Sequence, residues 1–276
     1  IDFSSFNTSG VNNMISMFEG CEKLKTIKFG ANFITSSVGS MSRMFLNCFS
    51  LLSLDLSTFD TSKVNNFDYT FSFCKSLTTL NLNNVITSSC TTFDNMFYGC
   101  YKLESLDVSG FNTSQVKTFN YMFKDCQTLK ILDLSSFDTS QVTDFSDIFS
   151  GCISLTSINV SSFVTSNAKK MNKMFKNCRS LTHLDITNFD TSKAQKLVSY
   201  FEGCSSLTSI DVSHFETSSC SDMDSMFYGC EILTSLDVSN FNTSKVTNMA
   251  KMFSNCTTLT TLDLSNFRTE KVITII

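Results

Sequence analysis

The feature that most constrains the fold of this chain is a repeat of 26 residues, marked by ten of the twelve cysteines. The first two of these cysteines are 27 residues apart, and every later gap is 26. They are Cys21, Cys48, Cys74, Cys100, Cys126, Cys152, Cys178, Cys204, Cys230 and Cys256. A period of this length indicates a solenoid, a propeller or another array of structural repeats. The segments SSCTTFDNMFYGC at 88–100 and SSCSDMDSMFYGC at 218–230 are five periods apart.

Each unit follows the pattern Phe-x-Thr-Ser-x-Val-x-x-Met-x-x-Met-Phe-x-x-Cys-x-x-Leu-x-x-Leu-Asp-Leu-Ser. All 12 Met stand in its two Met columns, and 20 of the 28 Phe fill two Phe columns in which Val85 is the single exception. With 42% apolar and 17% charged residues, the composition is that of a globular chain. The repeat therefore specifies one structural unit written about ten times.

The repeat unit predicts a strand followed by a helix. Residues 54–57 alternate apolar and polar side chains, as a half-buried strand does. From Val64 to Leu77 the apolar positions fall at offsets 0, 3, 7, 10 and 13, which predicts a helix with Ser62 as its N-cap. One such unit cannot bury its apolar side alone, but identical neighbours stacked on it can. We expect an α/β solenoid of about ten 26-residue coils, with the strands in a parallel sheet on the order of 50 Å long.

The strand region, Leu51-x-x-Leu54-x-Leu56-x-x-Phe59, resembles a leucine-rich repeat with Phe where Asn or Cys usually stands. In nearly every coil, MFxxCxxLxxLDLSxFDTSxV resembles the repeat of BspA-like surface proteins, which include the mycoplasma lipoprotein-type repeats. The resemblance covers essentially the whole chain. It implies a single leucine-rich-repeat superhelix over residues 1–276, with the sheet on the concave side and short helices on the convex side. It also implies an extracellular, cell-surface location and a role in adhesion or protein binding.

The cysteines are interpreted as free, buried thiols that act as small apolar residues. The two outside the main column, Cys90 and Cys220, stand where other units have Val or Ala. Helices of adjacent coils would lie 8–10 Å apart, roughly beyond the reach of a disulfide. A metal ladder is the alternative, but no His or carboxylate repeats beside the thiols. We therefore expect no metal and no cofactor.

Three groups of residues are candidate sites. The first, the acidic column, follows the strands on the solvent side of the expected concave sheet. It consists of Asp55, Asp107, Asp133, Asp185, Asp211, Asp237 and Asp263. Like charges in neighbouring coils repel by roughly 1 kcal/mol per pair in water, so something must compensate. The column either binds a cation or a basic ligand, or accepts hydrogen bonds from adjoining Ser residues such as Ser57 and Ser109.

The other two groups are places where the units differ from one another. The basic patch comprises Lys169, Lys170, Lys173, Lys176, Arg179, Lys193 and Lys196. It either receives an anionic partner or is an ordinary solvated face. The aromatic patch comprises Leu46, Phe49, Tyr69, Phe73, Tyr98, Tyr101 and Tyr121. It either contacts a protein or is partly covered by neighbouring loops.

No arrangement of catalytic residues is visible. The two histidines, His183 and His214, have no regularly placed nucleophile and carboxylate, and no phosphate-binding loop occurs. The net charge of −4 argues against nucleic-acid binding, and no apolar run is long enough for membrane insertion by this segment. We predict a non-catalytic cell-surface module that binds a protein or glycan on another cell surface.

The alternative is a structural spacer or a fibre-forming element that assembles through its ends or sides. Both ends of the sequence cut through the repeat pattern, and neither has a polar cap. We therefore expect a segment of a longer array with both end caps missing, or self-association through uncapped ends.

Overall fold

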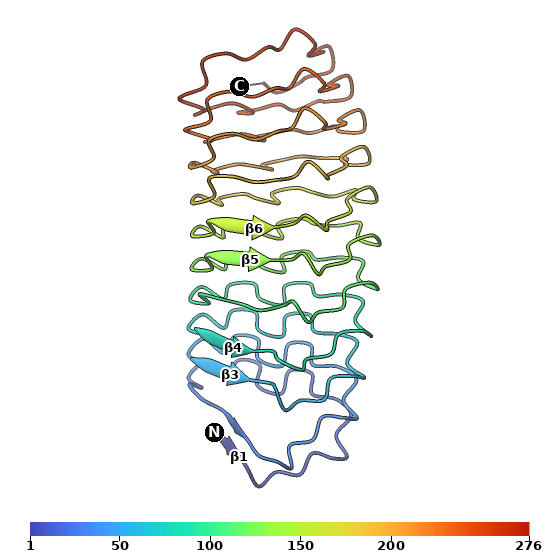
Figure 1. Ribbon diagram of the computed structural model, residues 1–276, viewed down its shortest axis with the longest axis vertical. Helices are drawn as coiled ribbons and strands as arrows, with labels where there is room; N and C mark the ends of the chain where they lie inside the picture. Colours follow the sequence, from blue (N-terminus) through green and yellow to red (C-terminus); the bar gives the residue numbers. More distant parts are fainter. Residues whose placement is uncertain (276) are drawn as a thin grey trace.

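The computed structural model, which describes residues 1–275, is a stack of coils, and each coil consists of one repeat (Figure 1). Six short strands lie on one side of the stack. They are β1 (Asp2–Phe3), β2 (Lys28–Phe29), β3 (Ser53–Asp55), β4 (Thr79–Asn81), β5 (Ile131–Asp133) and β6 (Ser157–Asn159). They pair in parallel as β1–β2, β3–β4 and β5–β6, with each residue opposite the one a full repeat away. The predicted parallel solenoid is therefore confirmed.

A second column of parallel contacts runs along another side of the stack. Single parallel bridges link Thr118, Asp144, Lys170, Lys196, Asp222, Asn248 and Thr274 in succession. Each member is again one repeat from the next. The coils are thus held in register on more than one side, which keeps equivalent residues in straight columns.

The prediction of convex helices is wrong, since no helix occurs in residues 1–275. Over 67–74 the chain instead makes successive turns. The N–H groups of Thr70 and Ser72 donate to carbonyls three residues back, at 3.1 Å in each case. The N–H groups of Tyr69 and Phe71 donate to the next coil, 3.0 and 2.9 Å from the carbonyls of Asp94 and Met96. Alternate donors therefore bond between coils, and none is left for a helical i−4 bond.

The turns also explain why the sequence looked helical. Each turn returns the chain to the interior after three or four residues, which is close to the 3.6-residue period of a helix. A different signal distinguishes the two: in every coil the residue before the repeat cysteine has a positive φ. Gly fills this position in five coils, Asn in three and Asp in one. These residues tolerate left-handed backbone and are poor in helix interiors, so this column could have predicted turns.

The core lies between the strand side and the turn side. The Phe, Met, Cys, Leu and Val columns are buried along almost the whole stack. In the column from Phe18 to Phe253, successive rings stack with centroids 5.3–6.0 Å apart. Each ring therefore fills the space above the preceding coil, and no coil has a complete core of its own.

A buried threonine column joins each coil to the next. The Thr139 hydroxyl donates to the carbonyl oxygen of Val164 at 3.0 Å and accepts the N–H of the same residue at 2.7 Å. Thr61 and Thr87 make the same pair of bonds with Ile86 and Asn112. The Thr-Ser pair of the repeat is thus a clamp between coils, and the interpretation of Ser62 as a helix N-cap is wrong.

All twelve cysteines are free, and ten of them are buried. In the main column, the Cys100 thiol donates to the carbonyl oxygen of Phe71 in the preceding coil at 3.2 Å. Burial raises the pKa of Cys100 to about 12, so the thiol stays protonated. The argument from helix spacing was wrong, because directly bonded coils lie about 5 Å apart. Burial and thiol–carbonyl bonds, and not helix spacing, are the features that favour free thiols here.

Candidate functional site

A groove on the turn side is lined by three aromatic side chains that the repeat pattern does not require, Tyr69, Phe73 and Tyr98. The groove has a volume of about 430 Å³. We call it the aromatic groove, and its lining consists of Ser42, Arg43, Leu46, Asn47, Asp68, Tyr69, Ser72, Phe73 and Tyr98. Equivalent positions of adjacent coils are neighbours in the stack, so outward residues 26 apart in sequence meet here.

The rings form a continuous cluster that extends beyond the groove. Phe73 and Tyr98 have centroids 4.6 Å apart, and Tyr98 lies 6.2 Å from Tyr121. Two lysines cover other faces of the cluster: the Lys75 Nζ lies 4.0 Å from the centroid of Phe49, and the Lys124 Nζ lies 4.7 Å from that of Tyr121. The cluster thus combines tilted aromatic pairs with cation–π contacts.

Phe73 occupies a backbone position that an aromatic residue rarely adopts. Its φ is +56°, in the column that holds Gly, Asn or Asp in all nine other coils. A bulky residue with a left-handed backbone is uncommon and costs about 1–3 kcal/mol. The next coil makes room for the ring with Gly99, where an added Cβ would lie 2.6 Å from the Phe73 ring. The two residues together place an aromatic wall in the groove.

The polar part of the groove centres on Asp68. Its Oδ1 accepts the Thr92 hydroxyl at 2.8 Å and the Asp94 N–H at 2.9 Å. Burial raises the pKa of Asp68, and burial together with the Asp68 charge raises the pKa of Asp94 to about 6. The side chain of Ser72 is fully buried, and its hydroxyl has no hydrogen-bond partner among the described residues. Sequence reasoning missed all three residues.

Four residues of the predicted aromatic patch, Leu46, Tyr69, Phe73 and Tyr98, line the groove, whereas Phe49, Tyr101 and Tyr121 are outside its lining. Leu46 is buried at 7% exposure and lines the floor of the groove, whereas an outward position was expected. Turn side chains do not follow the directions of a helix, so an outward helical position need not be outward here. Tyr69 is exposed, while Phe49, Phe73, Tyr98, Tyr101 and Tyr121 are half-buried.

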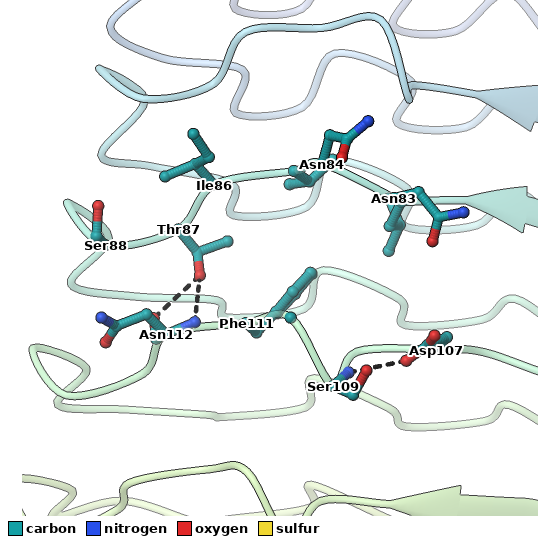
Figure 2. A pocket seen from close by; sticks show the side chains of 12 residues that line it. Asn83, Asn84, Ile86, Thr87, Ser88, Asp107, Ser109, Phe111 and Asn112 are labelled. Carbon is teal, nitrogen blue, oxygen red and sulfur yellow. Dashed lines mark hydrogen bonds between the residues drawn. The ribbon is translucent and has the colours of Figure 1, made fainter.

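A second pocket lies on the strand side, next to the coil that contains Val85 (Figure 2). It has a volume of about 600 Å³ and is lined by Asn83, Asn84, Ile86, Phe111 and Asn112 among others. It coincides with two departures from the repeat: Val85 replaces Phe, and Gly110 stands where six later coils carry Ser, Asn or His. We call it the strand-side pocket; its amides and hydroxyls were not predicted as a site.

The acidic column lies exposed beside the strands and serves the turns that follow them. Asp55 Oδ1 accepts the N–H of Ser57 at 2.9 Å, and Asp107 bonds Ser109 in the same way. The other five members make equivalent bonds two residues on. These bonds hold the pKa of each carboxylate in the column below its usual value. These are the hydrogen bonds from adjoining residues that the sequence predicts as the alternative to a bound cation or basic ligand. In residues 1–275 no group of His, Cys, Asp and Glu could hold a metal ion.

Three of the seven residues of the basic patch form ion pairs with carboxylates of adjacent coils. The amino groups of Lys170, Lys176 and Lys196 lie 3.1, 2.8 and 3.9 Å from carboxylates of adjacent coils. These partners are Asp144, Glu202 and Asp222. Lys193 donates to the Asn167 side chain, while Lys169, Lys173 and Arg179 have no ion pair among the described residues. Most of the patch therefore resembles a solvated face crossed by coil-to-coil pairs.

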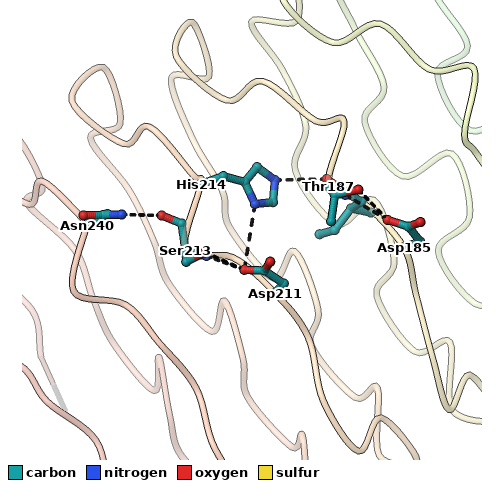
Figure 3. Close-up of polar contacts among 7 residues, drawn as sticks. Asp185, Thr187, Asp211, Ser213, His214 and Asn240 are labelled. Atoms are coloured by element: carbon teal, nitrogen blue, oxygen red, sulfur yellow. Dashed lines mark hydrogen bonds and ion pairs between the residues drawn. The ribbon is translucent and has the colours of Figure 1, made fainter.

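The histidines do not form a catalytic pair. His183 is exposed, while the His214 Nε2 lies 3.0 Å from the carbonyl oxygen of Ile186 in the preceding coil. Figure 3 shows that His214 belongs to a row of polar contacts between coils, with Asp211 and Asn240 nearby. The Asn240 amide likewise donates to a carbonyl oxygen of the preceding coil, that of Ser213, at 2.6 Å. His214 is thus one member of a structural column.

The geometry defines a class of protein: a parallel solenoid with grooves on two sides. A family model described as "Mycoplasma protein of unknown function, DUF285" matches residues 1–105, 75–184 and 178–275. Because these matches span nearly the whole chain, this chain belongs to that family. The resemblance to mycoplasma-type repeats of surface proteins is confirmed. No curated protein sequence gives a significant match.

Several solved structures are similar in architecture. A leucine-rich cell surface protein of Faecalibacterium prausnitzii is 19% identical, with a TM-score of 0.36, over 93% of this chain and 84% of that one. A leucine-rich-repeat protein of T. pallidum is 17% identical, with a TM-score of 0.33, over 52% and 72%. An internalin of Listeria monocytogenes is 15% identical, with a TM-score of 0.27, over 95% and 76%. Within residues 1–275, no helix is long and apolar enough to cross a membrane.

Proposed function

We propose that this chain is a non-catalytic binding module, displayed on the cell surface, that holds a protein partner in the aromatic groove. Cell-surface display is supported by family membership, since the repeats resemble those of surface proteins. A protein partner is supported by the aromatic side chains, because Tyr and other large rings are enriched where proteins bind one another.

The observation that carries the proposal is the local concentration of departures from the repeat. Three outward columns on the turn side contain Tyr69, Phe73 and Tyr98, and together they hold five aromatic residues along the chain. Four of these five lie between residues 69 and 121, and only Tyr228 lies elsewhere. A spacer or fibre-forming element has no need of such a concentration, since uniform coils stack equally well. The strain at Phe73 supports the same conclusion, because strained residues cluster at functional sites.

The test replaces the aromatic residues with residues that other coils already carry at those positions. The variant Tyr69→Ser/Phe73→Gly/Tyr98→Ser should keep the fold, because the threonine clamp and the core are untouched. Binding would be measured by surface plasmon resonance against a panel of purified extracellular-matrix and cell-surface proteins. We expect at least one saturable partner, and at least a tenfold loss of affinity for it in the triple variant. Tyr228→Ser, in a later coil, is the matched control and should bind normally.

Two results would overturn the proposal. One is growth of the purified chain into linear oligomers in light scattering with no saturable partner, which would favour the structural element. The other is saturable binding of an immobilised glycan that survives in the triple variant. If that binding were lost in Val85→Phe/Gly110→Asn, the ligand would belong to the strand-side pocket. Nothing lies within 4 Å of a Cβ added at Gly110, so this variant should fold.

A further inference from the structure

We propose that the aromatic groove is a receptor for one arginine side chain of the protein partner. Its guanidinium would stack on the exposed ring of Tyr69 and donate hydrogen bonds to Asp68. This inference rests on the proposed function in one respect, namely that a protein supplies the arginine. Charge, an exposed ring and an unsatisfied hydroxyl point to this ligand independently of one another.

The first observation is uncompensated negative charge. Both carboxylates, Asp68 and Asp94, are half-buried, and neither has an ion-pair partner among the described residues. The Oδ1 of Asp68 is occupied by two hydrogen bonds, whereas its Oδ2 accepts none from the described residues. Arg43 also lines the groove, but its guanidinium lies 3.0 Å from the Glu19 carboxylate, so this pair is neutral overall. The groove therefore attracts a cation.

The second observation is a ring with an unoccupied face. Elsewhere in the cluster, Lys75 covers Phe49 and Lys124 covers Tyr121, which shows that these rings pair with cations. Tyr69 is 40% exposed and, among the described residues, no lysine or arginine lies over its ring. A cation over an exposed ring contributes about 0.5–1 kcal/mol, and more where water is excluded. A groove beside Asp68 provides such a sheltered place.

The third observation is the Ser72 hydroxyl, which is buried without a partner in a lining residue of the same groove. Buried polar groups are nearly always hydrogen-bonded, so an exception requires an explanation. The hydroxyl has no solvent-exposed surface in the unbound chain, so an incoming donor would satisfy it after a small rearrangement of the groove lining. A guanidinium has five donors in one plane and can stack while it donates to several acceptors, which a lysine ammonium or a quaternary ammonium cannot do. This selects arginine among cations.

The chain contains its own comparison site, six repeats further on. Asp224 stands in the same column as Asp68, but Ser225 and Gly229 replace Tyr69 and Phe73. The same carboxylate position therefore occurs without the aromatic walls. If charge alone bound arginine, both places would bind it. If the aromatic groove is required, only the first will.

The experiment uses the whole chain labelled with 3-fluorotyrosine, because only six tyrosines are present and four belong to the aromatic patch. The probes are the peptide acetyl-Gly-Arg-Gly-amide and its citrulline counterpart, which has nearly the same shape but no charge. We expect arginine to shift the ¹⁹F signals of Tyr69 and Tyr98 saturably and to leave that of the buried Tyr200 unchanged. The citrulline peptide should bind at least tenfold more weakly. Signals would be assigned from single Tyr→Phe variants.

Two variants make the test specific. Asp68→Asn keeps the side-chain acceptor for Thr92 and Asp94 but removes the charge, and should weaken arginine binding at least tenfold. Asp224→Asn should leave it unchanged. Equal binding of the citrulline peptide, an unaffected Asp68→Asn, or tighter binding of choline or of the lysine peptide would overturn the inference. If the unmodified chain does not bind the arginine peptide, but binds a protein that the triple variant loses, the inference fails and the proposed function stands. Arginine binding with no saturable protein partner would overturn the proposed function alone.

Discussion

The segments 88–100 and 218–230 have nearly the same sequence and the same interior but different surroundings. Met, Phe and Cys are fully buried in both, at Met96, Phe97 and Cys100 in the first and at the matching positions in the second. Their tyrosines differ: the Tyr98 ring packs at a tilt against Phe73 of the preceding coil, whereas the residue equivalent to Phe73 in the second region is Gly203. The Tyr228 hydroxyl instead accepts a bond from Asn255 at 3.2 Å. The repeat itself determines the core, and adjacent coils determine the contacts of the outward side chains.

If the interior is equivalent in both regions, the threonine clamp should be equally important in both. Thr87 bonds the N–H and the carbonyl of Asn112 at 2.7 and 3.0 Å, and Thr217 bonds those of Asn242 at 2.7 and 3.2 Å. Thr87→Val and Thr217→Val keep the side-chain shape but leave two backbone groups unpaired. Each should lower the free energy of unfolding by about 2–4 kcal/mol.

Urea denaturation followed by circular dichroism would measure both losses, with the exposed Ser88→Ala as a control near zero. Losses that differ by more than about 1 kcal/mol would show that the two interiors are not equivalent.

The sequence predicted the interior well because columns of identical residues can be satisfied only by stacking. Period, parallel register and buried thiols all followed from that. The turns were mistaken for helices because apolar spacing reports how often the chain returns to the core and not where its N–H groups donate. The left-handed column from Gly20 to Asn255 contained the missing information.

The candidate site was only partly predictable. Outward positions in neighbouring coils correctly brought Tyr69, Phe73 and Tyr98 into one groove. The burial of Leu46 and the position of Asp68 depend on turn geometry, which a helical projection does not reproduce. The unpaired Ser72 hydroxyl depends on the orientation of a single rotamer, and no pattern in the sequence indicates that.

The outward tyrosines of the two segments should contribute differently to the free energy of unfolding, and this effect should be smaller than that of the threonine clamp. Tyr98→Ala removes contacts with Phe73 and Tyr121 and a cation–π contact with Lys124, so it should destabilise the chain by about 1–2 kcal/mol. Tyr228→Ala loses mainly one exposed hydrogen bond and should cost about 0.5 kcal/mol.

A double-mutant cycle that combines Tyr98→Ala with Phe73→Gly would isolate the contact between the two rings. The cycle is needed because Phe73→Gly alone also relieves the backbone strain at residue 73. A coupling energy near zero between Tyr98 and Phe73 would mean that the rings lie together without stabilising each other.

The smallest expected difference concerns Asp94 and Asp224, which occupy the same position in the two segments. Asp94 has the charged Asp68 one coil before it, whereas Val198 holds that place before Asp224. Burial first, and the Asp68 charge as well, raises the pKa of Asp94 from its ordinary 3.8 to about 6. The folded state therefore binds the proton more tightly than the unfolded state, and this group lowers stability as pH rises from about 4 to 6.

Asp94→Asn should remove that penalty while keeping an acceptor for Thr118 and Asn120. Because Asp94 is partly exposed, we expect a gain of no more than about 1 kcal/mol over Asp224→Asn at pH 7.5. The gain should disappear at pH 4, where the wild-type carboxyl is protonated. Thermal unfolding of both variants at the two pH values would measure it. A gain that persisted at pH 4 would come from packing or hydrogen bonding, and the negative charge beside the aromatic groove would then not be what distinguishes the two regions.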